Sequence, residues 1–250
     1  GLWFLLPAMW ALIPLSNVFM FTKVPIVPLV KEESKMMTLK ELLKNHYFRI
    51  SLILMACAGA SELTMSQWSS IFAQQGLQVS KVVGDLVGPC LFAVFMGLVR
   101  MLYGLKGEQI NIKKLLIVSS ALCVIFYSIA VFSRNPIFSL LGCALCGVSV
   151  ALMWPGTMSL TSSHLPYGGT IMFGAFAVMG DLGAAVGPWI AGFVSDRVQS
   201  ISQPLMVLFG ADVVLEQAKL KSGILLGMLF PLLMFLSLLW FGRVKKQKSA

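Results

Sequence analysis

The sequence contains few charged residues. Only 12% of its 250 residues are charged and only two are histidine, whereas about 25% of a typical soluble domain is charged. Hydrophobic residues make up 58% of the chain, and the mean hydropathy is +0.86. This composition excludes an ordinary soluble domain and indicates a chain that lies in lipid.

Sequence signatures of catalysis are also missing. No glycine-rich stretch ends in Gly-Lys-Ser/Thr, the pattern that holds nucleotide phosphates, so we expect no direct use of ATP. Cys143 and Cys146 form a single Cys-x-x-Cys, but without a second pair or a nearby histidine they indicate packing rather than a metal or redox site. Nothing resembles a nucleophile with its base. We therefore expect no enzyme activity, no cofactor and no metal.

Acidic residues are outnumbered by basic ones, 10 to 19, which gives a net charge of +9. In a soluble protein this excess would suggest nucleic acid as a partner. No basic stretch has the interleaved aromatic residues that stack bases, so nucleic-acid binding is excluded. Membrane proteins collect Lys and Arg in their cytoplasmic loops, which accounts for the excess.

Long apolar runs dominate the sequence. A helix needs about 20 apolar residues to cross the bilayer, and lipid offers the backbone no outside hydrogen-bond partner. The ten-residue alternation of a membrane β-barrel is absent. We therefore expect an all-α membrane protein with about seven transmembrane helices, at residues 1–21, 48–73, 82–103, 115–133, 137–161, 170–194 and 222–241.

The segments between and after these runs set the domain organisation. Residues 23–47 combine two prolines with mixed charges, which predicts a linker that holds a short amphipathic helix. Residues 242–250 form a basic tail. The chain opens on Gly1 and is at once apolar, which favours a segment of a longer protein; a signal peptide would have a basic start and no Pro7 or Pro14.

The basic residues predict the orientation. Threading seven spans leaves five of the 19 basic residues on one side, and the other fourteen share the side of the linker and the tail. By the positive-inside rule, that side is cytoplasmic. A seven-helix receptor has the same topology, but its Asn-Pro-x-x-Tyr motif lies at the inner end of the last helix, whereas Asn135 and Pro136 lie outside at the fifth run.

Six of the helices divide into two triplets, in residues 48–132 and 137–241. The middle helix of each carries a related phrase, GDLVGPCLFAVFMG from Gly84 and GDLGAAVGPWIAG from Gly180. These helices run in opposite directions, as in an inverted repeat. The last six helices are therefore expected to form a 3+3 inverted repeat.

Three stretches carry a resemblance that covers essentially the whole chain: ACAGASELTMSQW (56–68), MGLVRMLYG (96–104) and FGAFAVMGDLGAAVGPWIAGFVSD (173–196). Together they resemble the C-terminal half of a major facilitator superfamily transporter, helices six to twelve, in its fucose-permease-like branch. Residues 1–22 would be helix six, 23–47 the central cytoplasmic linker and 48–241 the six-helix half.

The resemblance implies a function and partners. It implies secondary active, proton-coupled transport of a small polar, sugar-like solute across the bacterial inner membrane, together with an N-terminal half outside this chain. The lipid bilayer, the solute and protons are the expected partners. A drug or metabolite efflux transporter of the same superfamily is the alternative.

Glu62 is the first candidate site residue, because it lies among small and apolar residues near the middle of its span. A charge at that depth costs several kcal/mol, in estimates that disagree. Ser66 shares its helix face at i+4. Glu62 is either a protonatable group in a wet cavity or a structural contact to a neighbouring helix.

Aromatic and amide side chains are candidates for solute binding. Gln67 and Trp68 could hydrogen-bond and stack a sugar, although a tryptophan near a helix end is also a common interface anchor. Trp154 lies either in the cavity wall or in the inner aromatic belt. The resemblance places its span as helix ten, a cavity liner.

The last candidates lie on the small-residue helix and at the inner-loop motif. Asp181 is a candidate for coupling or for an inter-helix hydrogen bond. Gly180, Gly183, Gly187 and Pro188 are candidates for close helix packing. Gly97, Arg100 and Gly104 are the gating candidates. They keep only the skeleton of the superfamily's inner-loop signature, and the lack of an acidic residue among them counts against a gating ion pair within the motif.

Overall fold

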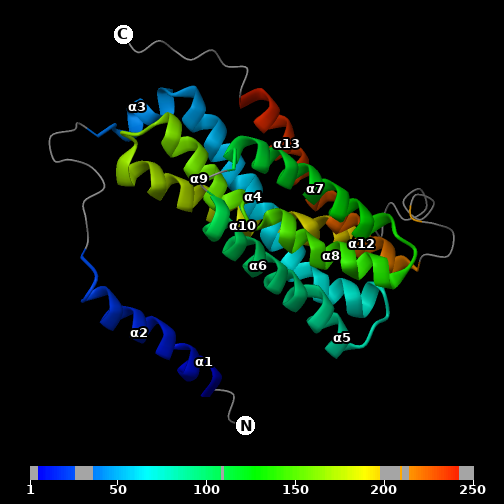
Figure 1. Ribbon diagram of the computed structural model, residues 1–250. Coiled ribbons are helices and arrows are strands. Elements are labelled where there is room, and N and C mark those ends of the chain that lie inside the picture. Colours follow the sequence, from blue (N-terminus) through cyan, green and yellow to red (C-terminus); the bar gives the residue numbers. More distant parts are fainter. Residues whose placement is uncertain (1–4, 26–35, 108–109, 198–208, 210–213, 242–250) are drawn as a thin grey trace. The chain divides into compact units, whose positions relative to one another are not determined.

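The computed structural model describes residues 5–25, 36–107, 110–197, 209 and 214–241. The chain divides into two units, Gly1–Lys35 and Met36–Ala250 (Figure 1). The basic tail at 242–250 and the middle of the expected linker, residues 26–35, lie outside the described residues.

The first unit contains one short apolar helix with a break. It consists of α1 (Leu5–Trp10) and α2 (Leu12–Phe21). The break at Ala11 has a local cause, because Pro14 has no N–H to donate to the carbonyl of Trp10, four residues earlier. The described part of this expected span, Leu5–Phe21, is shorter than the about 20 residues that a crossing needs.

Among its described residues, the second unit has six helices that are long and apolar enough to cross a membrane, and they confirm the remaining six spans. Nowhere in the described residues does a strand occur, so the all-α prediction is also confirmed. Four of these crossings are built from shorter pieces joined at π-helical turns or breaks. In chain order the crossings are α4 (His46–Ile71) with η1 (Phe72–Gly76); α5 (Lys81–Asp85), η2 (Leu86–Cys90) and α6 (Leu91–Lys106); α7 (Ile112–Phe132); α8 (Pro136–Val150) with α9 (Met153–His164); α10 (Gly169–Arg197); and α12 (Leu215–Gly227) with α13 (Leu229–Phe241).

A short helix, α3 (Leu39–Lys44), precedes the first crossing and matches the helix expected in the linker. It begins with a capping box, in which the Thr38 backbone N–H donates to Glu41 at 2.7 Å and the Thr38 hydroxyl accepts from the Glu41 backbone N–H. Leu42 is fully buried against the helices that follow. The α3 helix is thus fixed to the six-helix unit.

The helices of the two triplets pack reciprocally. α4, the first helix of one triplet, packs mainly against α10, the middle helix of the other, while α8 packs against α6 and α7. Figure 1 shows α4 crossing the middle of the unit. A repeat of three helices related by a two-fold axis produces this exchange of partners.

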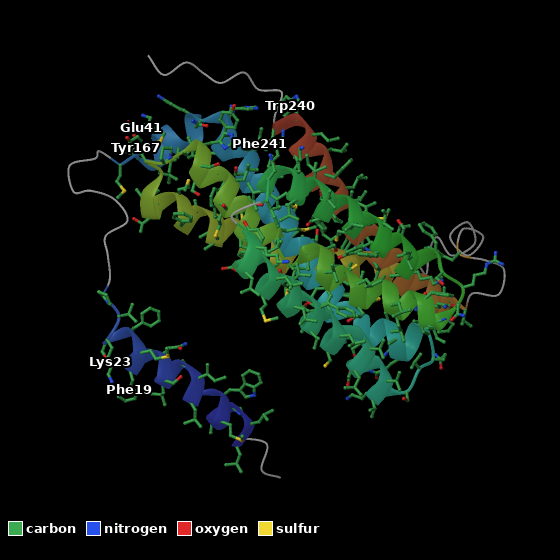
Figure 2. All side chains as sticks on the ribbon, in the orientation of Figure 1. Phe19, Lys23, Glu41, Tyr167, Trp240 and Phe241 are labelled. Atoms are coloured by element: carbon green, nitrogen blue, oxygen red, sulfur yellow. The ribbon has the colours of Figure 1, made fainter. Side chains whose placement is uncertain are left out.

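Aromatic rings hold one end of the unit together. Tyr47 at the start of α4 lies 5.0 Å from the ring of His164 and 5.2 Å from that of Phe241. Figure 2 shows Phe241 and Trp240 at the end of α13, at the same end of the unit as Glu41 and Tyr167. The ends of α9 and α13 are therefore tied to the beginning of α4.

Candidate functional site

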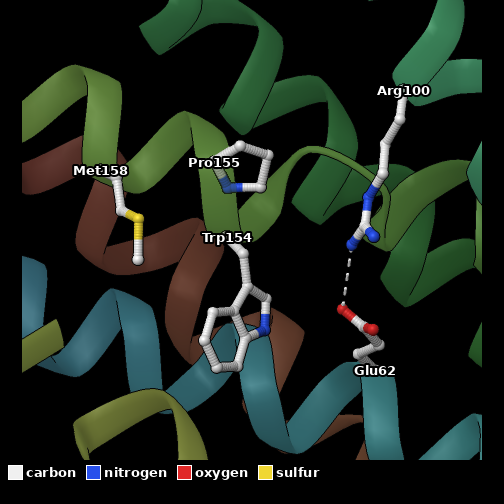
Figure 3. Close-up of a pocket in the computed structure, with 5 residues that line it drawn as sticks. All are labelled: Glu62, Arg100, Trp154, Pro155 and Met158. Atoms are coloured by element: carbon white, nitrogen blue, oxygen red, sulfur yellow. Dashed lines mark ion pairs between the residues drawn. The ribbon is translucent and has the colours of Figure 1, made fainter. Parts of the chain in front are cut away.

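An open pocket of about 540 Å³ lies between α4, α6 and α9. Figure 3 shows its lining, with Glu62 on α4 and Arg100 on α6 facing each other beside the indole of Trp154. The five lining residues are Glu62, Arg100, Trp154, Pro155 and Met158.

Proline creates the local structure on which the site depends. The fourth crossing breaks at Ala151 and Leu152, between α8 and α9. Pro155 lies four residues after Ala151 and has no N–H, so the Ala151 carbonyl receives no helical hydrogen bond from it. The Nε of Arg100 donates to that carbonyl at 2.9 Å instead. The arginine of one helix therefore replaces the donor that the proline of another helix lacks.

The guanidinium of Arg100 also faces a carboxylate. Its Nη2 lies 3.7 Å from Oε2 of Glu62, and the side chains are 43% and 17% exposed. This separation exceeds the about 2.7–3.2 Å of a direct N–H···O bond. The two groups therefore attract each other electrostatically without forming a direct hydrogen bond. The acid that faces Arg100 thus comes from another helix, α4.

Trp154 brings an unused hydrogen-bond donor to the same place. Its Nε1 is buried and has no partner within the described part of the chain. In Figure 3 this nitrogen is on the side of the ring that faces Glu62 and Arg100. A Cβ at Gly180 of α10 would collide with the Trp154 ring, so the absence of a side chain there makes room for the indole.

The other expected site residues lie outside the pocket lining. Ser66 donates to the Leu63 carbonyl of its own helix at 3.4 Å, and Gln67 is exposed. Trp68 packs against the main core, beside Gly192. Asp181 is exposed on α10.

The expected glycines occupy two kinds of environment. Gly97 and Gly104 are exposed on α6, and a Cβ at either would meet nothing within 4 Å. Gly180, Gly183 and Gly187 are buried on α10, with Pro188 half-buried beside them. The inner-loop glycines are therefore open positions, and the α10 glycines are close contacts.

Sequence reasoning missed two features of this site. Met158 lines the pocket because it follows Trp154 by four residues and so shares its helix face, a signal that was available. The contact between Glu62 and Arg100 joins different helices, and no spacing rule predicts it. In the described ranges no group of three or more His, Cys, Asp or Glu side chains is placed to hold a metal.

Comparison with known proteins gives one match. The family model of the Major Facilitator Superfamily matches residues 2–188, most of the chain. No curated protein and no solved structure matches. Because this match covers well over half of the chain, and the described residues contain six apolar helices long enough to cross a membrane, this chain belongs to the Major Facilitator Superfamily of membrane transporters and is a multi-pass integral membrane protein.

Proposed function

We propose that the chain is the C-terminal half, helices six to twelve, of a proton-coupled transporter for a small polar, sugar-like solute, akin to the fucose-permease-like branch. The observation that carries the proposal is the Glu62–Arg100 pair, which opens onto a pocket inside the membrane-spanning unit. Ionisable residues within a membrane mark substrate or ion pathways in most proteins that retain them.

The loose contact between the two charges supports proton coupling. At 3.7 Å the carboxylate of Glu62 is close enough to be stabilised by Arg100, but it keeps room to take up a proton. Its side chain is 17% exposed, and that exposure is toward the pocket it lines. In the proposed cycle, Glu62 alternates between a protonated state and the ion pair with Arg100.

The pocket also suits a small polar solute. Its volume of about 540 Å³ lies within the roughly 300–1,000 Å³ of small-molecule sites. Trp154 offers a flat ring and an N–H, and Arg100 offers further donors. Ser66, Gln67, Trp68 and Asp181 lie outside this lining and remain candidates for contacts with a solute or with the N-terminal half in another conformation.

The partner half has a surface to occupy. Gly97, Arg100 and Gly104 share an exposed face of α6, and Asp181 lies exposed on α10. In the proposal these faces pack against the N-terminal half, and Arg100 lies at their margin beside the pocket. Binding between two halves is the arrangement from which alternating access arises.

We further propose that the end formed by α3 and the C-terminus of α13 faces the cytoplasm of a bacterial cell. Lys40, Lys44 and Arg49 lie at this end, and Lys81 begins the second crossing at the opposite end. With the native cysteines replaced, an impermeant thiol reagent on intact cells should label Lys81→Cys but not Lys44→Cys. Labelling of Lys44→Cys alone would reverse the orientation.

The central test is Glu62→Gln in the full-length protein, reconstituted in proteoliposomes with labelled L-fucose as the first probe. The amide cannot ionise, so gradient-driven accumulation should be lost, while exchange across the membrane should persist. Glu216→Gln is the matched control, because Glu216 is exposed and pairs with Lys219 away from the pocket. Retained uphill transport by Glu62→Gln would remove the carboxylate from the mechanism.

A further inference from the structure

We propose that the solute carries a carboxylate, and that this carboxylate takes the place of Glu62 on the guanidinium of Arg100. The inference rests on the proposed transport function and narrows its solute to a hydroxylated acid instead of a neutral sugar. The inference is argued from the hydrogen-bond donors and acceptors that line the pocket.

Arg100 is held through its Nε, and within the described ranges its terminal nitrogens make no hydrogen bond. A guanidinium has five N–H donors. The Nε–H is used by the Ala151 carbonyl, at 2.9 Å, which fixes the plane of the group. The Nη2 atom lies 3.7 Å from Oε2 of Glu62, and the Arg100 side chain is 43% exposed. Arg100 is therefore preorganised to receive an anion.

Donors outnumber acceptors around the pocket. Arg100 and the indole Nε1 of Trp154 are donors, and the indole has no partner in the part of the chain that the structure describes. The side chains of Pro155 and Met158 add no donor and at most a weak sulfur acceptor. Only Glu62 supplies strong side-chain acceptors to the lining. A solute carboxylate would supply two more acceptor oxygens.

Competition for Arg100 gives the carboxylate a defined place in the cycle. When Glu62 binds a proton from water it loses its charge, and the solute carboxylate replaces it at the guanidinium. When the solute leaves, Glu62 returns its proton to water and pairs with Arg100 again. One proton therefore accompanies one carboxylate group.

The test compares acids with neutral counterparts of similar size. Thermal stabilisation of the purified full-length protein would be titrated with gluconate, glucuronate and lactate, and with glucitol, glucose and lactamide. At least one acid should bind about tenfold or more tightly than its neutral counterpart. Arg100→Gln should weaken the binding of that acid by roughly 10- to 100-fold, which corresponds to the free energy of hydrogen bonds to a charged group.

Two further variants separate binding from folding. Glu62→Gln removes the competing carboxylate and should tighten acid binding several-fold. A variant that merely disturbed the fold would weaken binding instead. Arg100→Lys keeps the charge but lacks the planar fork, so it should fall between wild type and Arg100→Gln. Arg49→Gln is the matched control, since Arg49 lies at the start of α4 outside the pocket.

The outcomes distinguish this inference from the proposed function. Equal binding of acids and neutral counterparts, with no effect of Arg100→Gln, would overturn the inference that the solute carries a carboxylate. Proton-driven accumulation of a neutral sugar would leave the proposed function standing and refute this inference. Tight, Arg100-dependent acid binding together with uphill transport that survives Glu62→Gln would support the carboxylate on the solute and refute proton coupling through Glu62.

Discussion

The two faces of α4 differ in how much freedom they leave the molecule. On the face toward α10 the backbones nearly touch: a Cβ at Gly183 would collide with the Ala56 carbonyl, and one at Gly187 would lie 2.8 Å from the Ala60 carbonyl oxygen. On the face toward α6 and α9, Glu62 borders an open pocket with a separated ion pair. The same helix thus joins a rigid contact to an adjustable one.

This difference suggests how the charges are held in place. Closely packed backbones cannot slide by small amounts. An ion pair at 3.7 Å, and an indole N–H without a partner among the described residues, can exchange partners at a small cost in free energy. The α4–α10 pair is expected to move as one body. Rearrangement during transport is then concentrated at the pocket face.

The largest effect is expected from Gly183→Ala. The new Cβ would meet backbone atoms of Ala56, which cannot rotate away as a side chain can. We expect a loss of about 3 kcal/mol in the free energy of unfolding, at the upper end for overpacking. Thermal unfolding in detergent measures it.

Gly174→Ala is the matched control on the same helix. A Cβ there meets nothing within 4 Å, and alanine favours a helix over glycine by up to about 1 kcal/mol. This variant should therefore be neutral or slightly stabilised. Similar losses at both positions would break the contrast between the packed face and the rest of α10.

The intermediate effect is expected from Pro155→Ala, which acts on the pocket face. Pro155 lies in the first turn of α9, where proline costs little stability, so the free energy of unfolding should change by less than about 1 kcal/mol. The new N–H can donate to the Ala151 carbonyl and compete with Arg100. Transport should fall roughly tenfold, equivalent to about 1.4 kcal/mol.

Uptake and thermal unfolding, measured together, decide this prediction. Pro166→Ala is a suitable control, because Pro166 is exposed in the turn between α9 and α10, away from the pocket. If Pro155→Ala unfolds more easily and transports in proportion to the folded fraction, the proline is only structural. If both quantities are unchanged, the Arg100 contact does not depend on the missing N–H.

The sequence could predict features that depend on one helix or one run. The α-helical crossings follow from apolar length, and the close-packing glycines follow from small residues spaced by three and four on α10. Glu62 stands out as a charge in an apolar run. These signals are local, so no knowledge of the packing was needed.

The arrangement between helices could not be read in the same way. Ser66 lies on the Glu62 face by spacing, yet it does not line the pocket, and its hydroxyl donates to the Leu63 carbonyl of its own helix. The position of Arg100 depends on a carbonyl that Pro155 leaves free two helices later along the chain. Such contacts depend on three-dimensional packing that a single sequence does not record.

The smallest effect is expected from Thr64→Val on the packed face of α4. The Thr64 hydroxyl is buried and has no hydrogen-bond partner among the described residues, while its methyl group lies near Gly227. An unpaired buried hydroxyl lowers stability by about 1–3 kcal/mol, and valine has nearly the same shape. Part of that gain is lost because the added methyl group is larger than the hydroxyl and lies beside Gly187. We therefore expect the free energy of unfolding to rise by about 1 kcal/mol, with transport unchanged, since Thr64 does not line the pocket.

Thr161→Val tests the opposite case with the same substitution. The Thr161 hydroxyl is fully buried but bonded, at 2.6 Å to the Ser51 hydroxyl and at 2.8 Å to the Thr157 carbonyl. Its loss should lower the free energy of unfolding by about 1–2 kcal/mol. The two variants should therefore shift the thermal midpoint in detergent in opposite directions. A loss of stability in both would mean that the Thr64 hydroxyl has a hydrogen-bond partner, and that the packed face of α4 contains a polar contact that the described residues do not show.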